Sequence, residues 1–105
     1  LNAYPREGRA ALASVGATDP GELYARILRE WLPDVAIDHL CPADADARLP
    51  GGVSLPDYAG IVWTGSSLTI HADDDERVER QITLARAAYA AGTPSFGSCW
   101  AAQIA

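Results

Sequence analysis

Hydrophobic and polar positions alternate along this chain in blocks that predict helices and strands in turn. Between Asp19 and Trp31, apolar side chains recur three and four residues apart, which predicts a helix with one buried face. Asp19 can accept hydrogen bonds at the helix start, Pro20 suits the first helical position, and Pro33 ends the helix. Tyr24 and Trp31 belong to the apolar stripe, so we expect both rings in the core.

A second amphipathic helix is predicted at residues 76–90. Its apolar positions repeat at helical spacing: Val78, Ile82, Ala85 and Tyr89. Gly92 suits the C-terminal cap of this helix. The acidic run Asp73-Asp74-Asp75-Glu76 fits the positive end of the helix, and we prefer that interpretation to a metal site. A shorter helical piece is predicted at Ala10–Ser14, after a polar, solvated loop at Arg6–Arg9.

Short apolar runs between the helices predict strands. Val35–Leu40 is one such run, and Gly60–Thr64 is another, apolar on both faces as parallel strands between helix layers are. Leu1–Tyr4 has the pattern of a strand end that Pro5 stops, and a further short strand begins near Thr93. Alternating strands and helices predict an α/β fold with a doubly wound parallel sheet and right-handed crossovers.

The stretch around Cys99 predicts a sharp turn between a strand and a helix. Gly97-Ser98-Cys99-Trp100-Ala101 has the form of a nucleophile elbow, the device of G-x-S-x-G hydrolases, with sulfur in place of oxygen. In that turn the nucleophile has a strained backbone, and the residues two positions to either side are small because strand and helix approach closely. Gly97 and Ala101 meet this need. We therefore predict Cys99 as a catalytic nucleophile.

A glycine-containing loop after the strand at Gly60–Thr64 predicts the oxyanion donor that would work with this nucleophile. Gly65-Ser66-Ser67 follows the carboxyl end of the strand, where ligands bind in open α/β sheets. Gly65 lets its backbone N–H approach a reacting oxygen. Alone it would be an ordinary loop glycine, but with Cys99 downstream we predict an oxyanion hole formed by the backbone N–H groups of Gly65 and Trp100.

These segments resemble class I glutamine amidotransferases, most closely the GMP-synthase-like ones, over most of the chain. Pro94–Gln103 resembles their nucleophile segment, G-[IV]-C-x-G-x-Q. Asp57–Ser67 resembles their D-x-x-G strand and T-G-S/G-P oxyanion loop, and Leu1–Pro5 resembles the end of their first strand. In two places the chain departs from the family: Ala101 replaces the usual glycine, and Ser67 stands where proline or glycine is commoner.

The resemblance implies a flavodoxin-like sheet, of which residues 1–105 would be the N-terminal half of one amidotransferase domain, without a second domain. It implies that Cys99 attacks glutamine and releases ammonia through a γ-glutamyl thioester, with Gln103, Ser66 and Ser67 contacting the substrate. The ammonia would pass to an acceptor site on a synthetase domain or subunit. No cofactor is implied. The family's catalytic His and Glu lie in an H-x-E segment after the elbow, which nothing here matches.

Two other functions stay open at this point. One is a related cysteine hydrolase of the γ-glutamyl peptidase type, which uses the same elbow and triad. The other is a non-catalytic interaction module, which Ala101 and the missing H-x-E favour, while Cys99 together with Gln103 speaks against it. His39 and His71 are candidate bases only in principle, because a histidine at a strand end or in a loop is more often an exposed side chain.

Composition limits the number of domains, the classes of partner and the cellular compartment that we expect. With 105 residues the chain forms one domain at most, and 49% hydrophobic residues indicate a globular chain. The net charge of −6 argues against nucleic acid as a partner, and no apolar run reaches the roughly 20 residues of a membrane helix. Cys41 has no metal-ligand partner at a suitable spacing, so we expect a small buried residue and no metal site. Two distant cysteines predict free thiols in the cytoplasm, and an uncovered sheet edge would favour association with a second copy.

Overall fold

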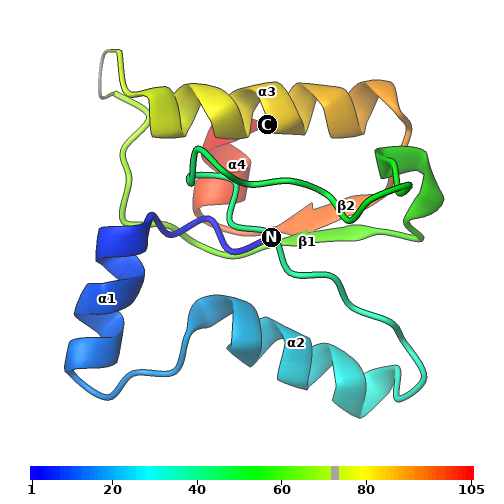
Figure 1. Cartoon of the computed structure of the whole chain (residues 1–105), viewed down its shortest axis with the longest axis horizontal. Helices are drawn as coiled ribbons and strands as arrows, with labels where there is room; N and C mark the ends of the chain where they lie inside the picture. Colours follow the sequence, from blue (N-terminus) through cyan, green and yellow to red (C-terminus); the bar gives the residue numbers. More distant parts are fainter. Residues whose placement is uncertain (72–73) are drawn as a thin grey trace.

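A parallel pair of short strands lies at the centre of the structure, a computed structural model that describes residues 1–71 and 74–105. Strand β1 (Ile61–Trp63) pairs with β2 (Ser95–Gly97) so that the first residues of the two strands are partners, as are the last. Helix α3 (Glu76–Ala90) connects them and covers one side of the pair (Figure 1). A parallel pair needs a crossover of this kind, since a tight turn cannot join its ends.

The remaining helices surround this unit (Figure 1). They are α1 (Arg6–Ser14), α2 (Pro20–Trp31), the 3-10 helix η1 (Leu55–Asp57) and the short α4 (Trp100–Ile104). In Figure 1, α2 and α3 lie on opposite sides of the strands, and α4 follows directly from β2. None of the helices in the described part of the chain is long and apolar enough to cross a membrane.

The bounds of the two long helices confirm their sequence predictions, but Tyr89, expected on the buried face of α3, is 90% exposed. Helix α2 begins at Pro20, where the Asp19 side chain accepts a hydrogen bond from the Glu22 backbone N–H at 3.1 Å. Helix α3 covers residues 76–90, and the Asp75 side chain caps its start in the same way. After α3, Gly92 has a φ of 70°, the left-handed conformation that glycine tolerates best.

The predicted loop at Arg6–Arg9 is wrong, because these residues form the first turns of α1. Pro5 precedes the helix with a φ of −68°, and its carbonyl accepts from the Arg9 N–H at 3.0 Å. Glu7 lies in the first turn, where a carboxylate is favourable, and it pairs with Arg77 of α3. Proline followed by an acidic residue is a helix-start signal, and it outweighs the polar character of the stretch.

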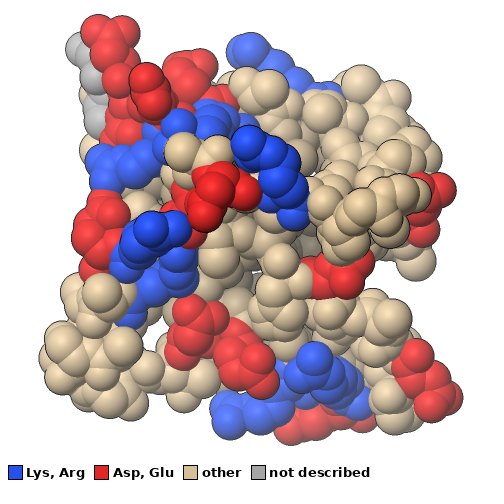
Figure 2. Space-filling model, in the orientation of Figure 1, with Lys and Arg blue, Asp and Glu red and all other residues tan. Residues whose placement is uncertain are grey.

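Charged side chains gather over α1 and the start of α3, as Figure 2 shows on one face of the molecule. Arg9 pairs with Asp44 at 2.7 Å and also donates to the Tyr4 carbonyl at 2.6 Å. Arg77 pairs with both Glu7 and Asp75, so it ties α1 to the capped end of α3. These pairs connect α1 to the loop at Asp44 and to the start of α3.

The expectation that Trp31 lies in the core is wrong, since this side chain is 81% exposed. Helix α2 buries only Gly21 and Ala25 completely. A β-carbon on Gly21 would lie 3.1 Å from Cβ of Asn2, so the first turn of the helix packs closely against the N-terminal segment. Because contact is made there by small residues, the last turn of the helix extends beyond the packed region.

The predicted strands at Val35–Leu40 and Leu1–Tyr4 are not formed, and a doubly wound sheet is not established. Only one backbone hydrogen bond of 2.8 Å, from the N–H of Asn2 to the Leu40 carbonyl, joins the two segments. Leu1 lies beside β1, where its carbonyl accepts from the Thr64 N–H at 3.0 Å. The terminal ammonium of Leu1 also donates to the Val62 carbonyl at 2.5 Å, so Leu1 pairs with β1, but over a single residue that is too short to form a strand. The coarser prediction, an α/β fold with parallel strands, is confirmed.

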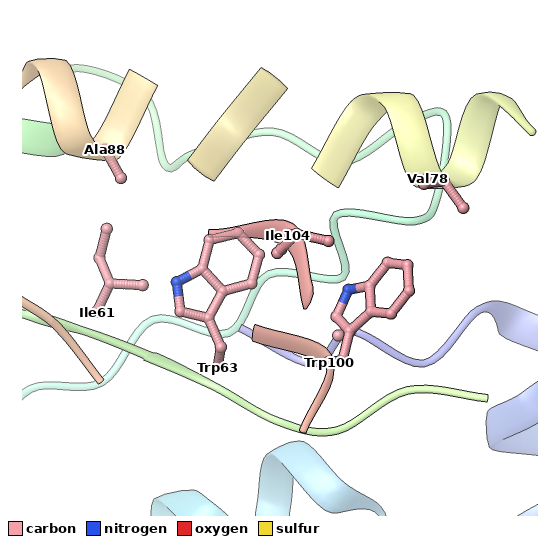
Figure 3. Close-up of a cluster of buried hydrophobic side chains, with 7 residues drawn as sticks. Ile61, Trp63, Val78, Ala88, Trp100 and Ile104 are labelled. Carbon is pink, nitrogen blue, oxygen red and sulfur yellow. The ribbon is translucent and has the colours of Figure 1, made fainter. Parts of the chain in front are cut away.

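The core lies between the strands and α3 (Figure 3). Figure 3 shows the rings of Trp63 and Trp100 pointing toward α3, from which Val78 and Ala88 project. Trp100 has no exposed surface at all. The residue that follows Cys99 is therefore anchored in the centre of the core, and this anchor holds the elbow.

Candidate active site

The backbone at Cys99 has the strained conformation that an elbow requires. Its φ is 56° and its ψ is −103°, and it forms the N-cap of α4. A positive φ is uncommon for a side-chain-bearing residue and costs about 1–3 kcal/mol, so such residues gather at functional sites. The Cys99 side chain is exposed, and its thiol is free. The predicted sharp turn is present, and the catalytic role of Cys99 stays a prediction.

The strand and the helix of the elbow touch at Gly97. A β-carbon on Gly97 would lie 2.4 Å from Cβ of Ala101 and 2.9 Å from Cβ of Trp63, which no packing tolerates. Glycine is therefore required at position 97. Ala101, which stands where the resembling family has glycine, fits because Gly97 leaves its methyl group the necessary space.

The glycine loop and the elbow lie at the same edge of the strand pair. Trp63 is the register partner of Gly97, and the two parallel chains both continue toward that edge. Gly65 and Cys99 each follow their strand's last residue by two positions. A β-carbon on Gly65 would meet no atom within 4 Å, so open space borders this glycine. The structure thus brings the two predicted segments together.

The two predicted oxyanion donors have no protein acceptor among the described residues, although Trp100 itself is fully buried. Within residues 1–71 and 74–105, the backbone N–H groups of Gly65 and Trp100 donate to no protein acceptor. Trp100 is the first residue of α4, and the first N–H groups of a helix have no partner inside it. Two unpaired backbone donors at one edge of the strand pair are compatible with an oxyanion hole, which stays a prediction.

The side chains predicted to contact substrate differ in their surroundings. The Ser66 hydroxyl donates to the Ala3 carbonyl at 2.9 Å and accepts from the Leu68 N–H at 3.1 Å, so it holds the loop. Ser67 Oγ lies 2.7 Å from where a β-carbon on Gly8 would be, so its hydroxyl faces α1. Gln103 is exposed on α4. Of the three, Gln103 has the side chain most available to a substrate.

The structure does not pair either histidine with the cysteine through a hydrogen bond among the described residues. His39 and His71 are both exposed, and neither side chain forms a hydrogen bond with Cys99 in the part of the chain that the structure describes. No group of three or more His, Cys, Asp or Glu side chains suited to a metal ion occurs among the described residues, and Asp73 of the acidic run lies outside them. Cys41 is half-buried, and this burial raises the pKa of its thiol.

One buried polar residue was missed by sequence reasoning. Gln81 of α3 has no exposed surface, and its side chain bonds to both Trp100 and Ala3. A signal was available, because position 81 falls three residues after Val78 and next to Ile82 on the apolar stripe. A polar side chain on a buried stripe must find partners, since an unpaired one is costly.

An apolar groove with a volume of about 720 Å³ runs beside β2 and α4. Phe96 of β2 and Tyr89 of α3 line it, with exposed fractions of 67% and 90%. Gly97 and Ala101 border it as well, so it adjoins the elbow.

Comparison with known proteins identified a similar curated enzyme. The chain is 31% identical over 97 residues to a gamma-glutamyl-L-1-hydroxyisopropylamide hydrolase from Pseudomonas sp.. The match covers 92% of this chain and 32% of that enzyme, so the chain spans about a third of the length of its relative. No protein-family model and no solved structure matches the chain. The relative's name describes hydrolysis of a γ-glutamyl amide, and this loosely supports the resemblance seen in the sequence.

Proposed function

We propose that this chain carries the nucleophile and the oxyanion loop of a cysteine-dependent hydrolase of γ-glutamyl amides. The observation that carries the proposal is the strained, exposed Cys99, with the unpaired N–H groups of Gly65 and Trp100 at the same sheet edge. The similarity to a hydrolase of a γ-glutamyl amide supports the choice of substrate class.

The chemistry follows from these groups. The Cys99 sulfur adds to the γ-carbonyl carbon, and the carbonyl oxygen becomes an oxyanion that accepts from the two backbone N–H groups. On collapse the C–N bond breaks, and the amine leaves with a proton while a γ-glutamyl thioester forms. Water then adds to the thioester, which releases glutamate and restores the thiol. We assign the proton acceptor to no residue of this chain, because neither histidine forms a hydrogen bond with Cys99 among the described residues.

Gln103 is our candidate for orienting the glutamyl part of the substrate. It lies one helical turn after Cys99 on α4 and is exposed. An amide side chain can donate to a carboxylate and accept from an ammonium group, and the glutamyl part of the substrate carries both. Ser66 contributes indirectly, by holding the loop that carries Gly65.

A second candidate is the glutaminase reaction of an amidotransferase, in which ammonia is the leaving amine and passes to a synthetase subunit. It uses the same thioester, and glutamine is the smallest γ-glutamyl amide. The motif that joins Cys99 to Gln103 favours it. The identity of the released amine separates the two candidates.

The strain at Cys99 speaks against a non-catalytic interaction module. A conformation that costs about 1–3 kcal/mol persists only where the surrounding structure enforces it. Here a buried Trp100 and a side-chain-free Gly97 enforce it. A module that uses only its surface would gain stability from glycine at position 99.

Labelling with a chloroketone analogue of glutamine tests the proposal. Intact-mass measurement should show one adduct on the 11.1 kDa chain, formed faster than with a simple chloroketone and slowed by excess glutamine. Cys99→Ser should abolish the adduct, and Cys41→Ser, the matched control, should retain it. Equal labelling of both cysteines, or no protection by glutamine or by a γ-glutamyl alkylamide, would contradict the proposal.

A further inference from the structure

A buried hydrogen-bond network connects the elbow to helix α3. The indole Nε1–H of Trp100 donates to Gln81 Oε1 at 2.8 Å, and Gln81 Nε2 donates to the Ala3 carbonyl at 3.2 Å. Gln81, Trp100 and Ala3 have no exposed surface. Three segments far apart in the sequence therefore meet at one amide side chain.

The same network continues to the glycine loop. The Ala3 carbonyl also accepts from the Ser66 hydroxyl at 2.9 Å, and the Ala3 N–H donates to Thr64 Oγ1 at 2.9 Å. Thr64 and Ser66 flank Gly65 in sequence. The backbone of Ala3 therefore holds the loop from both sides, and Gln81 holds Ala3 and the elbow together.

The chemistry of this position requires an amide. Its oxygen accepts from the indole while its nitrogen donates to a carbonyl, so one side chain serves two partners of opposite kind. A carboxylate could accept from Trp100 but could not donate to Ala3. A leucine could do neither, and it would leave the buried indole N–H unpaired at a considerable cost.

We infer that Gln81 is a positioning residue that aligns the N–H groups of Gly65 and Trp100 with each other through this network. The inference rests on the proposed function, in which the two N–H groups share one oxyanion. Each donor lies on a separate segment, and a shift of about 1 Å between donors and reacting atoms can cost about a hundredfold in rate. Gln81 reaches the elbow through Trp100 and the glycine loop through Ala3.

The test compares two alkylation rates of Cys99 in each variant. The chloroketone analogue of glutamine places a ketone oxygen in the oxyanion position, whereas iodoacetamide reacts at a methylene carbon and needs no oxyanion donor. The ratio of the two rates therefore reports donor alignment. We expect Gln81→Leu to lower this ratio about tenfold or more while the iodoacetamide rate stays within about twofold. Gln81→Glu, which keeps the acceptor and loses the donor, should lower it in the same direction.

Val78→Ala is the matched control. Val78 is buried on the same helix, three residues before Gln81, and its truncation weakens the core without touching the network. Its melting temperature should fall while its ratio stays at the wild-type value. An equal fall of the ratio in Val78→Ala would mean that the ratio follows stability alone, and it would overturn the inference.

A double variant separates positioning from stability. Gln81→Leu combined with Trp100→Phe removes both buried partners, so the melting temperature should recover part of the loss seen in Gln81→Leu. The ratio should stay low, because the link between the two segments is still absent. Recovery of the ratio together with the melting temperature would show a merely structural role.

The remaining outcomes distinguish failure of the inference from failure of the proposed function. If Gln81→Leu does not fold, Trp100→Phe alone keeps an aromatic ring at position 100 and breaks the link, and an unchanged ratio in that variant overturns the inference. If the wild-type protein shows no preference for the glutamine analogue, the proposed function fails, and the inference fails with it. A selective wild type with an unchanged ratio in folded Gln81→Leu overturns the inference alone.

Discussion

The Ala101 methyl group occupies the space that a side chain on Gly97 would need, since a β-carbon on Gly97 would lie 2.4 Å from Cβ of Ala101. One residue ends the strand before the elbow, and the other lies in the first turn of the helix after it. The closeness of these two positions sets the angle at which the chain turns through Cys99. Any side chain at position 97 must move α4 or β1.

We predict that Gly97→Ala lowers the free energy of unfolding by about 1–3 kcal/mol, the usual cost of overpacking a close contact. Urea unfolding followed by circular dichroism measures this. Gly51→Ala is the control, because a β-carbon there meets no atom within 4 Å. Ala101→Gly should rescue Gly97→Ala only in part, since Trp63 still lies 2.9 Å from the added carbon. A Gly97→Ala variant as stable as Gly51→Ala would refute the predicted crowding.

We predict that Cys99→Gly raises the free energy of unfolding by about 1 kcal/mol while it abolishes labelling by the glutamine analogue. Glycine tolerates a φ of 56°, so the strain at position 99 is relieved, and part of this gain is offset by the greater freedom of the unfolded chain. Ser98→Gly has no positive φ to relieve and should only destabilise. Equal losses of stability in the two variants would show that the turn stores no strain.

We predict that stability falls between about pH 4 and pH 2 through Asp75. Hydrogen bonds from Arg77 lower the pKa of this carboxyl from its ordinary 3.8 to about 2. Because its pKa is lower in the folded chain than in the unfolded one, Asp75 stabilises the fold above pH 4 and loses that contribution as the pH falls through about 2. Unfolding by urea across this range, compared between wild type and Asp75→Asn, isolates the contribution.

Asparagine is itself a good helix cap, so Asp75→Asn should keep α3 intact and lose only the charge. Asp46→Asn is the control, because Asp46 is an exposed carboxylate outside the cap. The prediction is wrong if Asp75→Asn shows the same loss of stability between pH 4 and pH 2 as Asp46→Asn.

We predict that Trp31→Gln changes the free energy of unfolding by less than about 0.5 kcal/mol, since the ring lies almost wholly in solvent. Trp63→Ala, in contrast, removes a ring that is 4% exposed and should cost about 3–5 kcal/mol. Thermal and urea unfolding of the two variants test this together. A large loss in Trp31→Gln would mean that the end of α2 packs against other parts of the chain.

The helices could be placed from the sequence because their signals are local. Asp19 and Pro20 start α2, and residues 76–90 form α3 as their spacing predicts. Burial and sheet membership depend on partners that a local pattern does not contain. The apolar spacing of α2 placed Trp31 inside, but the contact is made at Gly21, and Val35–Leu40 has strand-like residues without the ladder of bonds that makes a strand.

Sequence separation decided which parts of the site could be predicted: the elbow is local in the sequence, whereas the network is not. Gly97, Cys99 and Ala101 lie within five positions, so their relation can be recognised in the sequence. Gln81 depends on Trp100, 19 positions away, and on Ala3, 78 positions away. Its position on a buried helical stripe predicts that it needs partners, but only the folded chain shows which ones it has.

The bond from Gln81 to Ala3 also determines when in folding the site can work. Bringing together residues 78 positions apart closes a long loop, and the entropic cost of that closure must be met before the contact can form. The turn at Cys99 is local and can form early, so a partly folded chain has a thiol but no aligned pair of donors. The capacity to hold an oxyanion should therefore arise with the last cooperative step of folding. The rate of selective labelling of Cys99 would then report when folding is complete.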